Sequence, residues 1–218
     1  MTYLVAPTVL RVAPEALAAR VRERFGGELR RAGSFAQLCL LGAQACLEAA
    51  PARRSLGVLW ASSHGARIAA RAAMREAASG EPVMPFTFVA TQPHLAATLL
   101  AQRSAPVARA AFVHIDPSGW PRLLSLAQVW LAGCEQVLVG WAEEAAEGEA
   151  HQSDWCVLQK NPAEVSCEPL REARGALPAT SADWLARVAE WLASPREALA
   201  LRGGGEAWRF AAAATSSA

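Results

Sequence analysis

The sequence contains few residues of the kinds that build metal centres and disulfide frameworks. Among its 218 residues are four histidines, far apart in the chain, and five cysteines, none of them in a CxxC pair. Dispersed ligands of this kind exclude a zinc knuckle, and an odd number of scattered cysteines argues against a disulfide scaffold. We therefore expect no bound metal or other cofactor, and reduced thiols in a cytoplasmic protein.

Strong charge of one sign and long apolar runs are also missing. The formal net charge is +1, which argues against a nucleic-acid-binding protein. No run of about 18 apolar residues is free of charge, so no membrane span is expected, and the N-terminus lacks the pattern of a secretory signal. The charge is uneven, +4 over residues 1–54 and −7 over residues 134–172. Solvated faces of unlike sign explain this simply, and steering of a partner is the alternative.

Apolar residues, in contrast, are plentiful. They make up 53% of the chain and include eight tryptophans, which are expected to anchor the core or an interface. A chain of this length can bury one sizeable core. We therefore expect residues 1–210 to form a single domain and residues 211–218 a disordered tail. Gly42 interrupts a run of apolar residues at helical spacing, which predicts a close contact of that helix with its neighbour.

Periodicity predicts an α/β domain in which strands and helices alternate. Continuous apolar runs predict three strands buried on both faces, at 56–61, 110–115 and 136–141. Further extended segments are predicted at 1–12, 86–90, 154–159 and 206–210. Apolar residues at helical spacing predict helices at 14–31, 34–50, 66–79, 94–102, 120–131 and 184–192. This alternation is typical of helices layered on a sheet.

The histidines were considered as functional residues one by one. His114, inside a predicted buried strand, is expected to be a core histidine, and His151, in a predicted acidic loop over 143–152, to be exposed. His64 lies close to Ser62 in the chain, which could suggest a hydrolase. Because there is no GxSxG elbow and residues on one loop rarely reach nucleophile–base geometry, a hydrogen-bonding role for His64 is the simpler interpretation.

Three segments, in order along the chain, carry a family resemblance: Leu56–Gly65, Met84–Ala97 and Phe112–Glu144. The first resembles the strand and glycine-ended loop that follow the first helices of a β-ketoacyl synthase. The second resembles the stretch sP-x-x-F-x-x-S-V-H-N-A of a short ketosynthase-like family, often labelled chain length factor, found beside aryl-polyene and related pigment pathways. The third resembles the nucleophile strand, its elbow and helix, and the strand ending in VGG-x-E. The resemblance covers about residues 35–160.

The chain departs from that family at positions that an active ketosynthase needs. The elbow of an active enzyme begins with cysteine, and alignment on Ser118 and Gly133 places Asp116 there. A carboxylate is a poor replacement for a thiolate nucleophile, so we assign no catalytic residue. Asp116 is instead expected to cap the following helix, with Pro117 at its first position. The C-terminal half of a ketosynthase, with its two histidines and usually a lysine, has no counterpart in these 218 residues.

The resemblance implies both a fold and a function. The fold is α/β, a three-layer thiolase-like half-fold whose mixed, mostly parallel sheet is flanked by helices. The function is that of a non-catalytic, chain-length-factor-type subunit that pairs with a full-length β-ketoacyl synthase. An acyl carrier protein is a further candidate partner, and a homodimer is an open alternative. Two other functions stay open: a small acyl-thioester transferase or hydrolase that uses another nucleophile, and a scaffold without an acyl role.

The resembled segments also supply candidates for the acyl tunnel or the subunit interface, because their aromatic residues would suit an apolar wall. Trp120 and Trp130 are ten positions apart on a predicted helix and point about 80° from one another, so one can serve the core and the other a contact surface. The candidates are Phe86, Phe88, His94, Phe112, Asp116, Trp120 and Trp130.

Overall fold

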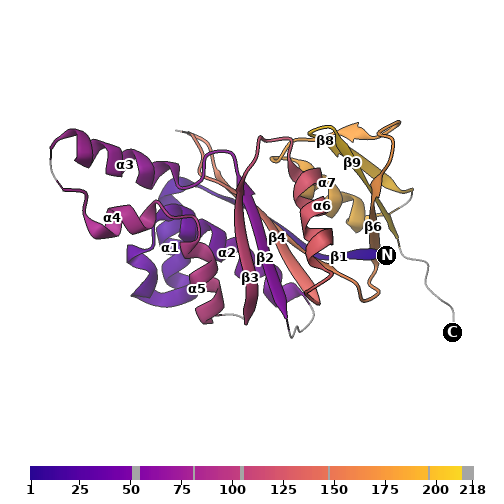
Figure 1. The fold of residues 1–218 in the computed structure, drawn as a ribbon, viewed down its shortest axis with the longest axis horizontal. Helices are drawn as coiled ribbons and strands as arrows, with labels where there is room; N and C mark the ends of the chain where they lie inside the picture. The colour runs from indigo at the N-terminus through magenta and orange to yellow at the C-terminus, as the bar shows by residue number, and fades with distance from the viewer. Residues whose placement is uncertain (51–54, 81, 104–105, 147, 196, 213–218) are drawn as a thin grey trace.

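The described part of the chain forms one mixed sheet with helices on both faces (Figure 1). The computed structural model describes residues 1–50, 55–80, 82–103, 106–146, 148–195 and 197–212. Within them, no helix is long and apolar enough to cross a bilayer. The strands are β1 (Thr2–Val12), β2 (Leu56–Ser62), β3 (Val107–His114), β4 (Gln136–Glu143), β5 (His151–Gln159), β6 (Val165–Leu170), β7 (Leu177–Pro178), β8 (Leu199–Gly203) and β9 (Glu206–Ala212). The helices are α1 (Pro14–Phe25), the 3₁₀ helix η1 (Gly26–Arg31), α2 (Ser34–Ala49), α3 (Arg67–Ala78), α4 (Pro85–Ala90), α5 (Leu95–Arg103), α6 (Trp120–Trp130) and α7 (Trp184–Ala193).

The strand order among the described residues is β3-β2-β4-β5-β1-β6-β9-β8-β7. Parallel pairing is confined to β2 with β3, β2 with β4, and β7 with β8, and the other five neighbouring pairs are antiparallel. The expected mixed sheet flanked by helices is confirmed, but parallel pairs are its minority. One cause is the short connection from β4 to β5, since parallel neighbours need a long crossover.

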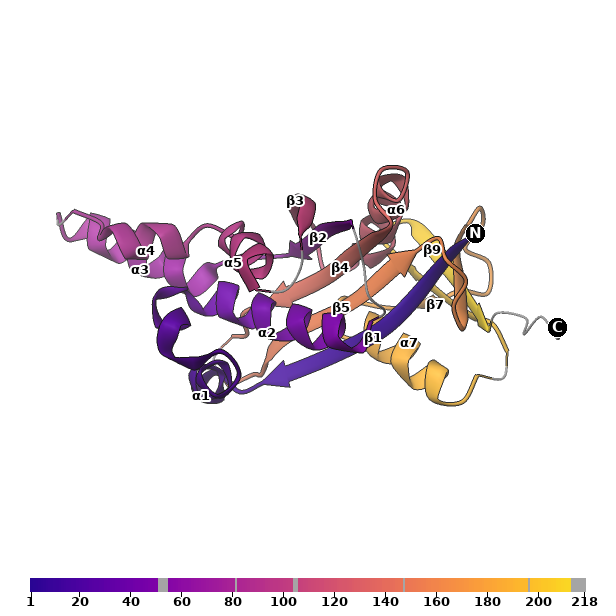
Figure 2. The ribbon, with the colours of Figure 1, turned by 90° about the horizontal axis from the view of Figure 1, so that it is seen from below.

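The central strands bury side chains on both faces of the sheet. Every residue of β2 and β5 is buried. Along β2, Val58 and Trp60 enter a core shared with α1, α2 and α5, whereas Leu59 and Ala61 enter a second core under α6 and α7. Figure 2 shows α2 and α6 on opposite sides of β4 and β5. The predicted burial of the strands at 56–61 and 136–141 on both faces is thereby confirmed.

Helix α2 lies against β5 at its glycine. A Cβ on Gly42 would stand 2.7 Å from Cδ1 of Trp155 and would overlap Oγ of Ser153. That hydroxyl donates to the Leu38 carbonyl (2.9 Å) and accepts a hydrogen bond from the Trp155 indole N–H (2.8 Å). The close contact predicted at Gly42 is confirmed. At this point α2 packs directly on the hydrogen-bonded side chains of Ser153 and Trp155 within the core.

Both ends of the chain depart from the predicted boundaries. The predicted helix 14–31 is wrong beyond Phe25, because Gly26 takes a φ of +74° and the chain continues as η1. At the other end, β9 continues through Ala212, two residues into the predicted tail. The rest of that tail, 213–218, lies outside the described residues.

The predicted extended segment at 86–90 is wrong, because these residues belong to helix α4. Pro85 occupies the first turn, where its fixed φ suits a helix and its missing N–H costs little. The Glu76 carboxylate of α3 accepts hydrogen bonds from the Met84 N–H and the Thr87 hydroxyl, each 3.0 Å long. A contact from the neighbouring helix thus stabilises the start of α4.

Two histidines have environments opposite to those predicted. The predicted buried strand at 110–115 is β3, which lies at the edge of the sheet, so His114 at its end is exposed and not a core residue. The predicted loop over 143–152 is shorter than expected, and His151 begins the central strand β5. Its side chain is therefore buried, with only 2% exposed.

Candidate functional site

The edge strand β3 carries Phe112, one of the predicted site residues. In the described part of the chain β3 pairs with β2 and with no strand on its other side. Its side chains are half-buried or exposed, and in Figure 1 the strand lies between α5 and α6. An edge with outward-facing N–H and C=O groups is a template for pairing with another chain.

An aromatic cluster behind β3 brings two predicted site residues together. The Phe112 ring lies 5.7 Å from Trp60 and 5.9 Å from Phe35, measured between centroids. The His94 ring stands edge-on to Trp60 at 5.6 Å, and that of His114 edge-on to Phe112 at 4.8 Å. Phe112 and His94 therefore meet through Trp60, which sequence reasoning did not select, because nothing local distinguishes it from other core tryptophans.

The interior beside Trp60 does not form an acyl tunnel. The gap there measures about 10 Å³, with Cys39 and Leu100 among its lining residues. A space of that size holds about one water molecule. If the aromatic cluster serves an acyl chain, it must do so from the surface of β3 and α5 and not from this gap.

The two predicted tryptophans of α6 have different environments. Trp120 is 1% exposed and lies in the core under α6 and α7. Trp130 is half-buried, and its ring faces Arg109 of β3, whose guanidinium carbon is 5.6 Å from the ring centroid. On the outer face of α6, Leu126 is 43% and Val129 71% exposed. Trp120 therefore lies in the core, and Trp130 lies beside the edge strand β3.

The remaining predicted aromatic residues lie on an arm formed by α3 and α4, which extends away from the sheet (Figures 1 and 2). Neither helix contains a buried residue. Phe86 is 54% and Phe88 59% exposed, and the side chains of Met74 and Met84 are exposed still further. The Phe86 ring packs against the guanidinium of Arg31, at 4.8 Å. A group of large exposed apolar side chains usually marks a binding surface.

Polar groups gather where the parallel strands β2 and β4 end. The Glu143 carboxylate accepts hydrogen bonds from the Ser62 hydroxyl (2.9 Å) and the Ser63 N–H (2.7 Å), and lies 2.8 Å from Nδ1 of His64. Ser62 is fully buried and also accepts from the Gly65 N–H (2.8 Å). The hydrogen-bonding role predicted for His64 is confirmed. Its partner Glu143 was missed because the two residues are 79 positions apart and meet only through the sheet.

Asp116, at the predicted nucleophile position, lies in an exposed loop between β3 and α6. Its Oδ1 accepts hydrogen bonds from the hydroxyl and the N–H (2.9 Å) of Ser118, and these, the hydroxyl first, lower the pKa of the carboxyl. The carboxylate therefore closes a turn within the loop. The predicted helix cap is wrong, because α6 begins at Trp120 with Gly119 as N-cap and Pro121 in the first turn. The five cysteines are buried elsewhere, so this loop presents no thiol.

A buried carboxylate at the base of the arm was not found from the sequence. Glu144 is 1% exposed and accepts hydrogen bonds from the Ile68 N–H (2.7 Å) and the Ser34 hydroxyl. Burial raises the pKa of this carboxyl. The Arg67 guanidinium donates to the carbonyl oxygen of the same residue, at 2.8 Å. Together these bonds tie the start of α3 to the end of β4. The only local signal was a pair of adjacent glutamates directly after a buried strand.

Comparison with known proteins identifies the fold. No family model and no curated protein matches the sequence. Among solved structures, a chain in the complex of the ketosynthase ApeO with its chain length factor ApeC from Xenorhabdus doucetiae matches with a TM-score of 0.64 and 16% identity, over 97% of both chains. The ishigamide ketosynthase/chain length factor matches with a TM-score of 0.57 and 14% identity, over 77% of this chain and 67% of that one. The chain has the ketosynthase fold.

Low sequence identity to these structures explains why no single motif in the sequence identified the fold. Only 16% of the aligned positions are identical, yet the match to the ApeO–ApeC chain covers nearly the whole of both chains. A chain of about this length can therefore carry the fold. A chain in a third similar structure, AntDE:AntF, a type II polyketide synthase acyl-carrier protein in complex with its ketosynthase, matches with a TM-score of 0.52 and 14% identity, over 72% of this chain and 57% of that one.

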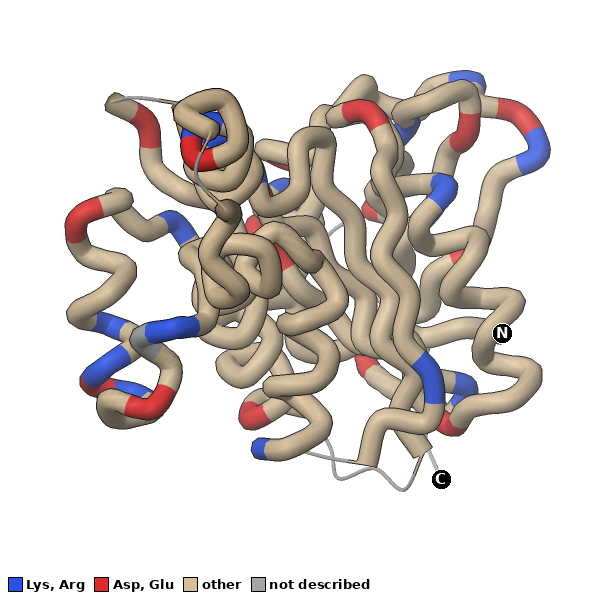
Figure 3. Tube along the Cα trace, turned by 60° about the vertical axis from the view of Figure 1, so that its left-hand side comes forward, with Lys and Arg blue, Asp and Glu red and all other residues tan. Residues whose placement is uncertain are grey.

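Charge is distributed over this ketosynthase-fold chain less unevenly than the sequence suggested. Two of the acidic residues in the stretch 134–172, Glu144 and Asp154, are buried, and Asp154 forms an ion pair with Arg11. In Figure 3 basic and acidic residues are interspersed at both sides of the view, and the strands near its middle are mostly uncharged. The sheet edge is thus better suited to an apolar than to a strongly charged partner surface.

Proposed function

We propose that this chain is a non-catalytic, chain-length-factor-type subunit that pairs with a full-length β-ketoacyl synthase. The observation that carries the proposal is the fold likeness over 97% of both chains to a chain of a ketosynthase–chain length factor complex. The loop at Asp116 supports the non-catalytic part, because it presents a carboxylate where a condensing enzyme needs a thiolate.

The proposed contact surface has three parts. The outer edge of β3, which no other described strand pairs with, offers backbone pairing. The exposed face of α6, with Leu126 and Val129, and the aromatic residues Phe86 and Phe88 of the arm offer apolar area. Obligate partners bury about 2,000 Å² or more, largely apolar, so surfaces of this kind fit a permanent heterodimer. On this proposal the acyl chain lies between the subunits, with Phe112 and His94 in its wall.

The finer parts of the proposal concern the biological setting. We place the subunit in the cytoplasm, in aryl-polyene-type or related polyketide or fatty-acid biosynthesis, with an acyl carrier protein delivering the substrate to the ketosynthase. The buried thiols are compatible with this setting: burial raises the pKa of Cys39 and Cys156 well above the usual value, which keeps both as neutral thiols of low reactivity.

Co-expression tests the pairing. The chain should be produced with a ketosynthase encoded beside its gene, and alone, and each sample analysed by size-exclusion chromatography with light scattering. We expect a stable complex of one copy of each protein, and self-association of the chain alone. A monodisperse monomer that ignores every neighbouring ketosynthase would contradict the proposal. A stable homodimer that excludes the ketosynthase would favour the homodimer instead.

The alternative of a small acyl-thioester transferase or hydrolase receives no support from the polar cluster. His64 is paired with the Glu143 carboxylate, as a general base would be. Ser62, however, is fully buried, and its hydroxyl donates a hydrogen bond to Glu143 and not to His64. Incubation of the lone chain with acyl thioesters, followed by intact-mass measurement, tests this. We expect neither a covalent adduct nor turnover, and either of them would restore the enzymatic alternative.

A further inference from the structure

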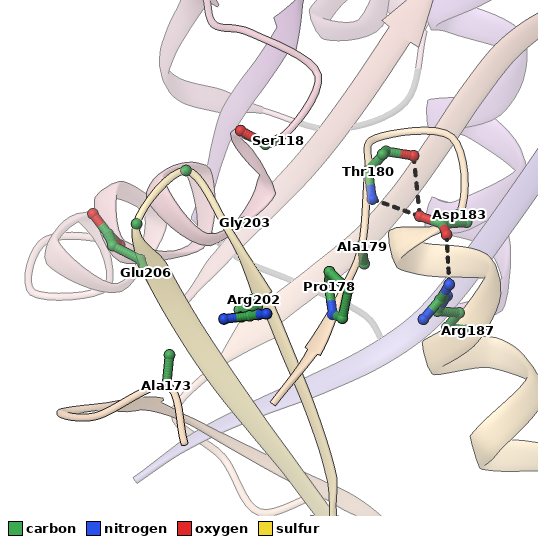
Figure 4. A pocket seen from close by; sticks show the side chains of 12 residues that line it. Ser118, Ala173, Pro178, Ala179, Thr180, Asp183, Arg187, Arg202, Gly203 and Glu206 are labelled. Atoms are coloured by element: carbon green, nitrogen blue, oxygen red, sulfur yellow. Dashed lines mark hydrogen bonds and ion pairs between the residues drawn. The ribbon is translucent and has the colours of Figure 1, made fainter. Parts of the chain in front are cut away.

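A cavity of about 670 Å³ lies where the strands farthest from β3 in the sheet order, β7, β8 and β9, meet the loop that follows β3. It is open to solvent on one side, where Arg202 is exposed, and is bordered by the β8–β9 hairpin, the segment from β7 to α7, and the loop that follows β3 (Figure 4). Its volume falls in the range of small-molecule sites, roughly 300–1,000 Å³. Residues from four separate parts of the chain line it, among them Ser118, Ala173, Pro178, Arg187, Arg202 and Gly203.

Hydrogen bonds and glycines hold the walls of this cavity in place. The Ala179 N–H donates to the Arg202 carbonyl (3.0 Å), and the Ser181 N–H donates to the Pro117 carbonyl. At the hairpin, a Cβ on Gly203 would overlap the Ser118 carbonyl oxygen and stand 3.2 Å from that of Ala179. The hairpin tip therefore lies directly on the loop after β3, and only glycine permits that approach. The cavity is preformed rather than a gap between loosely arranged loops.

Two of the charged groups around the cavity are neutralised by their own neighbours. The Asp183 carboxylate accepts hydrogen bonds from the N–H (2.6 Å) and hydroxyl (3.1 Å) of Thr180, and lies 2.9 Å from the Arg187 guanidinium. The Glu206 carboxylate turns toward α6 (Figure 4), where it accepts from the Ser125 hydroxyl (2.8 Å) and lies 4.0 Å from Arg122. Both acidic side chains thus have a cation of their own.

Arg202 is different from the other charged groups of the cavity. Within the described part of the chain, no carboxylate lies within 4.0 Å of its guanidinium, although it lines the cavity between the hairpin and Pro178 (Figure 4). The four charged residues of the lining, Asp183, Arg187, Arg202 and Glu206, carry no net charge together, and among the described residues Arg202 is the one of the four that has no ion-pair partner. Ala173, Pro178 and Ala179 contribute apolar surface to the lining, and Ser118 and Thr180 contribute hydroxyl groups.

We propose that this cavity binds a small organic anion, whose carboxylate or phosphate headgroup pairs with Arg202 and whose short apolar part lies against Ala173 and Pro178. A planar guanidinium can hold either headgroup through two parallel hydrogen bonds. This site goes beyond the proposed pairing with a ketosynthase and does not depend on it, because none of its residues belongs to the β3 edge, the outer face of α6 or the arm.

Amide NMR of the isotope-labelled full-length chain tests the site, with the ketosynthase complex used if the chain is not stable alone. The probes are hexanoate and hexyl phosphate, with hexan-1-ol as the uncharged control. We expect one or both anions to shift the amide signals of Ser118 and Gly203–Gly205 in a saturable way, and hexan-1-ol to leave them unchanged. Comparison of the two anions identifies the preferred headgroup.

Matched variants assign the effect to Arg202. Arg202→Gln should weaken binding about tenfold or more, as expected for loss of a charge-assisted, two-point contact. Arg209→Gln is the control, because Arg209 lies on the adjacent strand and pairs with Glu168 (3.7 Å), and should bind as the native chain does. Ala173→Trp, which fills the cavity without changing charge, should abolish binding even if Arg202→Gln proves unstable.

Three outcomes would overturn the proposal. The first is the absence of saturable shifts at the cavity with both anions. The second is equal binding of hexan-1-ol, which would make the cavity a merely apolar site. The third is equal weakening by Arg202→Gln and Arg209→Gln, which would indicate general surface charge. Co-expression with the ketosynthase is measured separately, so failure of either proposal can be told from failure of the other.

Discussion

The arm formed by α3 and α4 provides a sharp test of the proposed pairing. Phe86 is 54% exposed and Phe88 59% exposed. More than half of each residue is therefore not packed against the rest of the chain. Full burial of a phenylalanine contributes about 1.5–3 kcal/mol, so covering the exposed half of each ring contributes about 1 kcal/mol. Phe86→Ala with Phe88→Ala should therefore weaken association by about 2 kcal/mol, or about 30-fold in Kd.

The same double variant should leave the lone chain almost as stable as before. The rings are already largely exposed, and the main internal loss is the contact of Phe86 with Arg31, worth about 0.5–1 kcal/mol at an exposed site. Titration of a fluorescently labelled ketosynthase measures Kd, and urea unfolding measures stability. Leu177→Ala is the matched control, since Leu177 is 52% exposed but lies on β7, at the opposite end of the sheet.

The reasoning would be refuted by native-like affinity of the double variant for a ketosynthase that the native chain binds. Equal weakening by Leu177→Ala would also refute it, because the effect would then reflect any exposed apolar side chain. A loss of several kcal/mol in unfolding free energy would show instead that the arm belongs to the core of the lone chain.

Three further predictions concern stability and chemistry. Gly42→Ala should lower the unfolding free energy by about 1–3 kcal/mol, because its Cβ would overlap Ser153, while Gly27→Ala, with open space around it, should have little effect; equal effects would exclude the packing explanation. Burial, and next the charge of Arg67, lowers the pKa of His151 below its usual 6.5, so the neutral imidazole stabilises the fold above that pH and this contribution is lost as the pH falls. The unfolding free energy of the native chain minus that of His151→Gln should accordingly decrease from about pH 7 to about pH 5, and a pH-independent difference would contradict the assignment. Asp116→Asn should change stability by less than about 0.5 kcal/mol and leave ketosynthase-dependent product formation intact, and loss of that activity with pairing preserved would show that the carboxylate takes part in the chemistry.

The sequence alone determined the elements whose signal is local. Unbroken apolar runs predicted the strands at 56–61 and 136–141, because a strand buried on both faces cannot tolerate polar alternation. Gly42 predicted a close helix contact. The order and spacing of three short motifs indicated the ketosynthase fold, and Asp116 marked the loop that lacks a nucleophilic thiol. The strands and the glycine contact rest on residues within a single segment, and the resemblance rests on the order of short segments along the chain.

Only the tertiary structure decided which strand lies at the edge and which distant residues meet. The apolar runs of β3 and β2 look alike in the sequence, yet β3 is half exposed because no described strand covers its outer side. The segment with Phe86 and Phe88 is rich in residues that favour strands, but it forms helix α4, whose start is stabilised by hydrogen bonds to Glu76 of the neighbouring helix. His64 contacts Glu143, which is 79 positions away in the sequence. The cavity at Arg202 forms only because the β8–β9 hairpin packs against the loop after β3. Periodicity indicates which type of element a segment forms and which of its faces are apolar, whereas strand order, burial at the edge and long-range contacts follow from how the whole chain packs together.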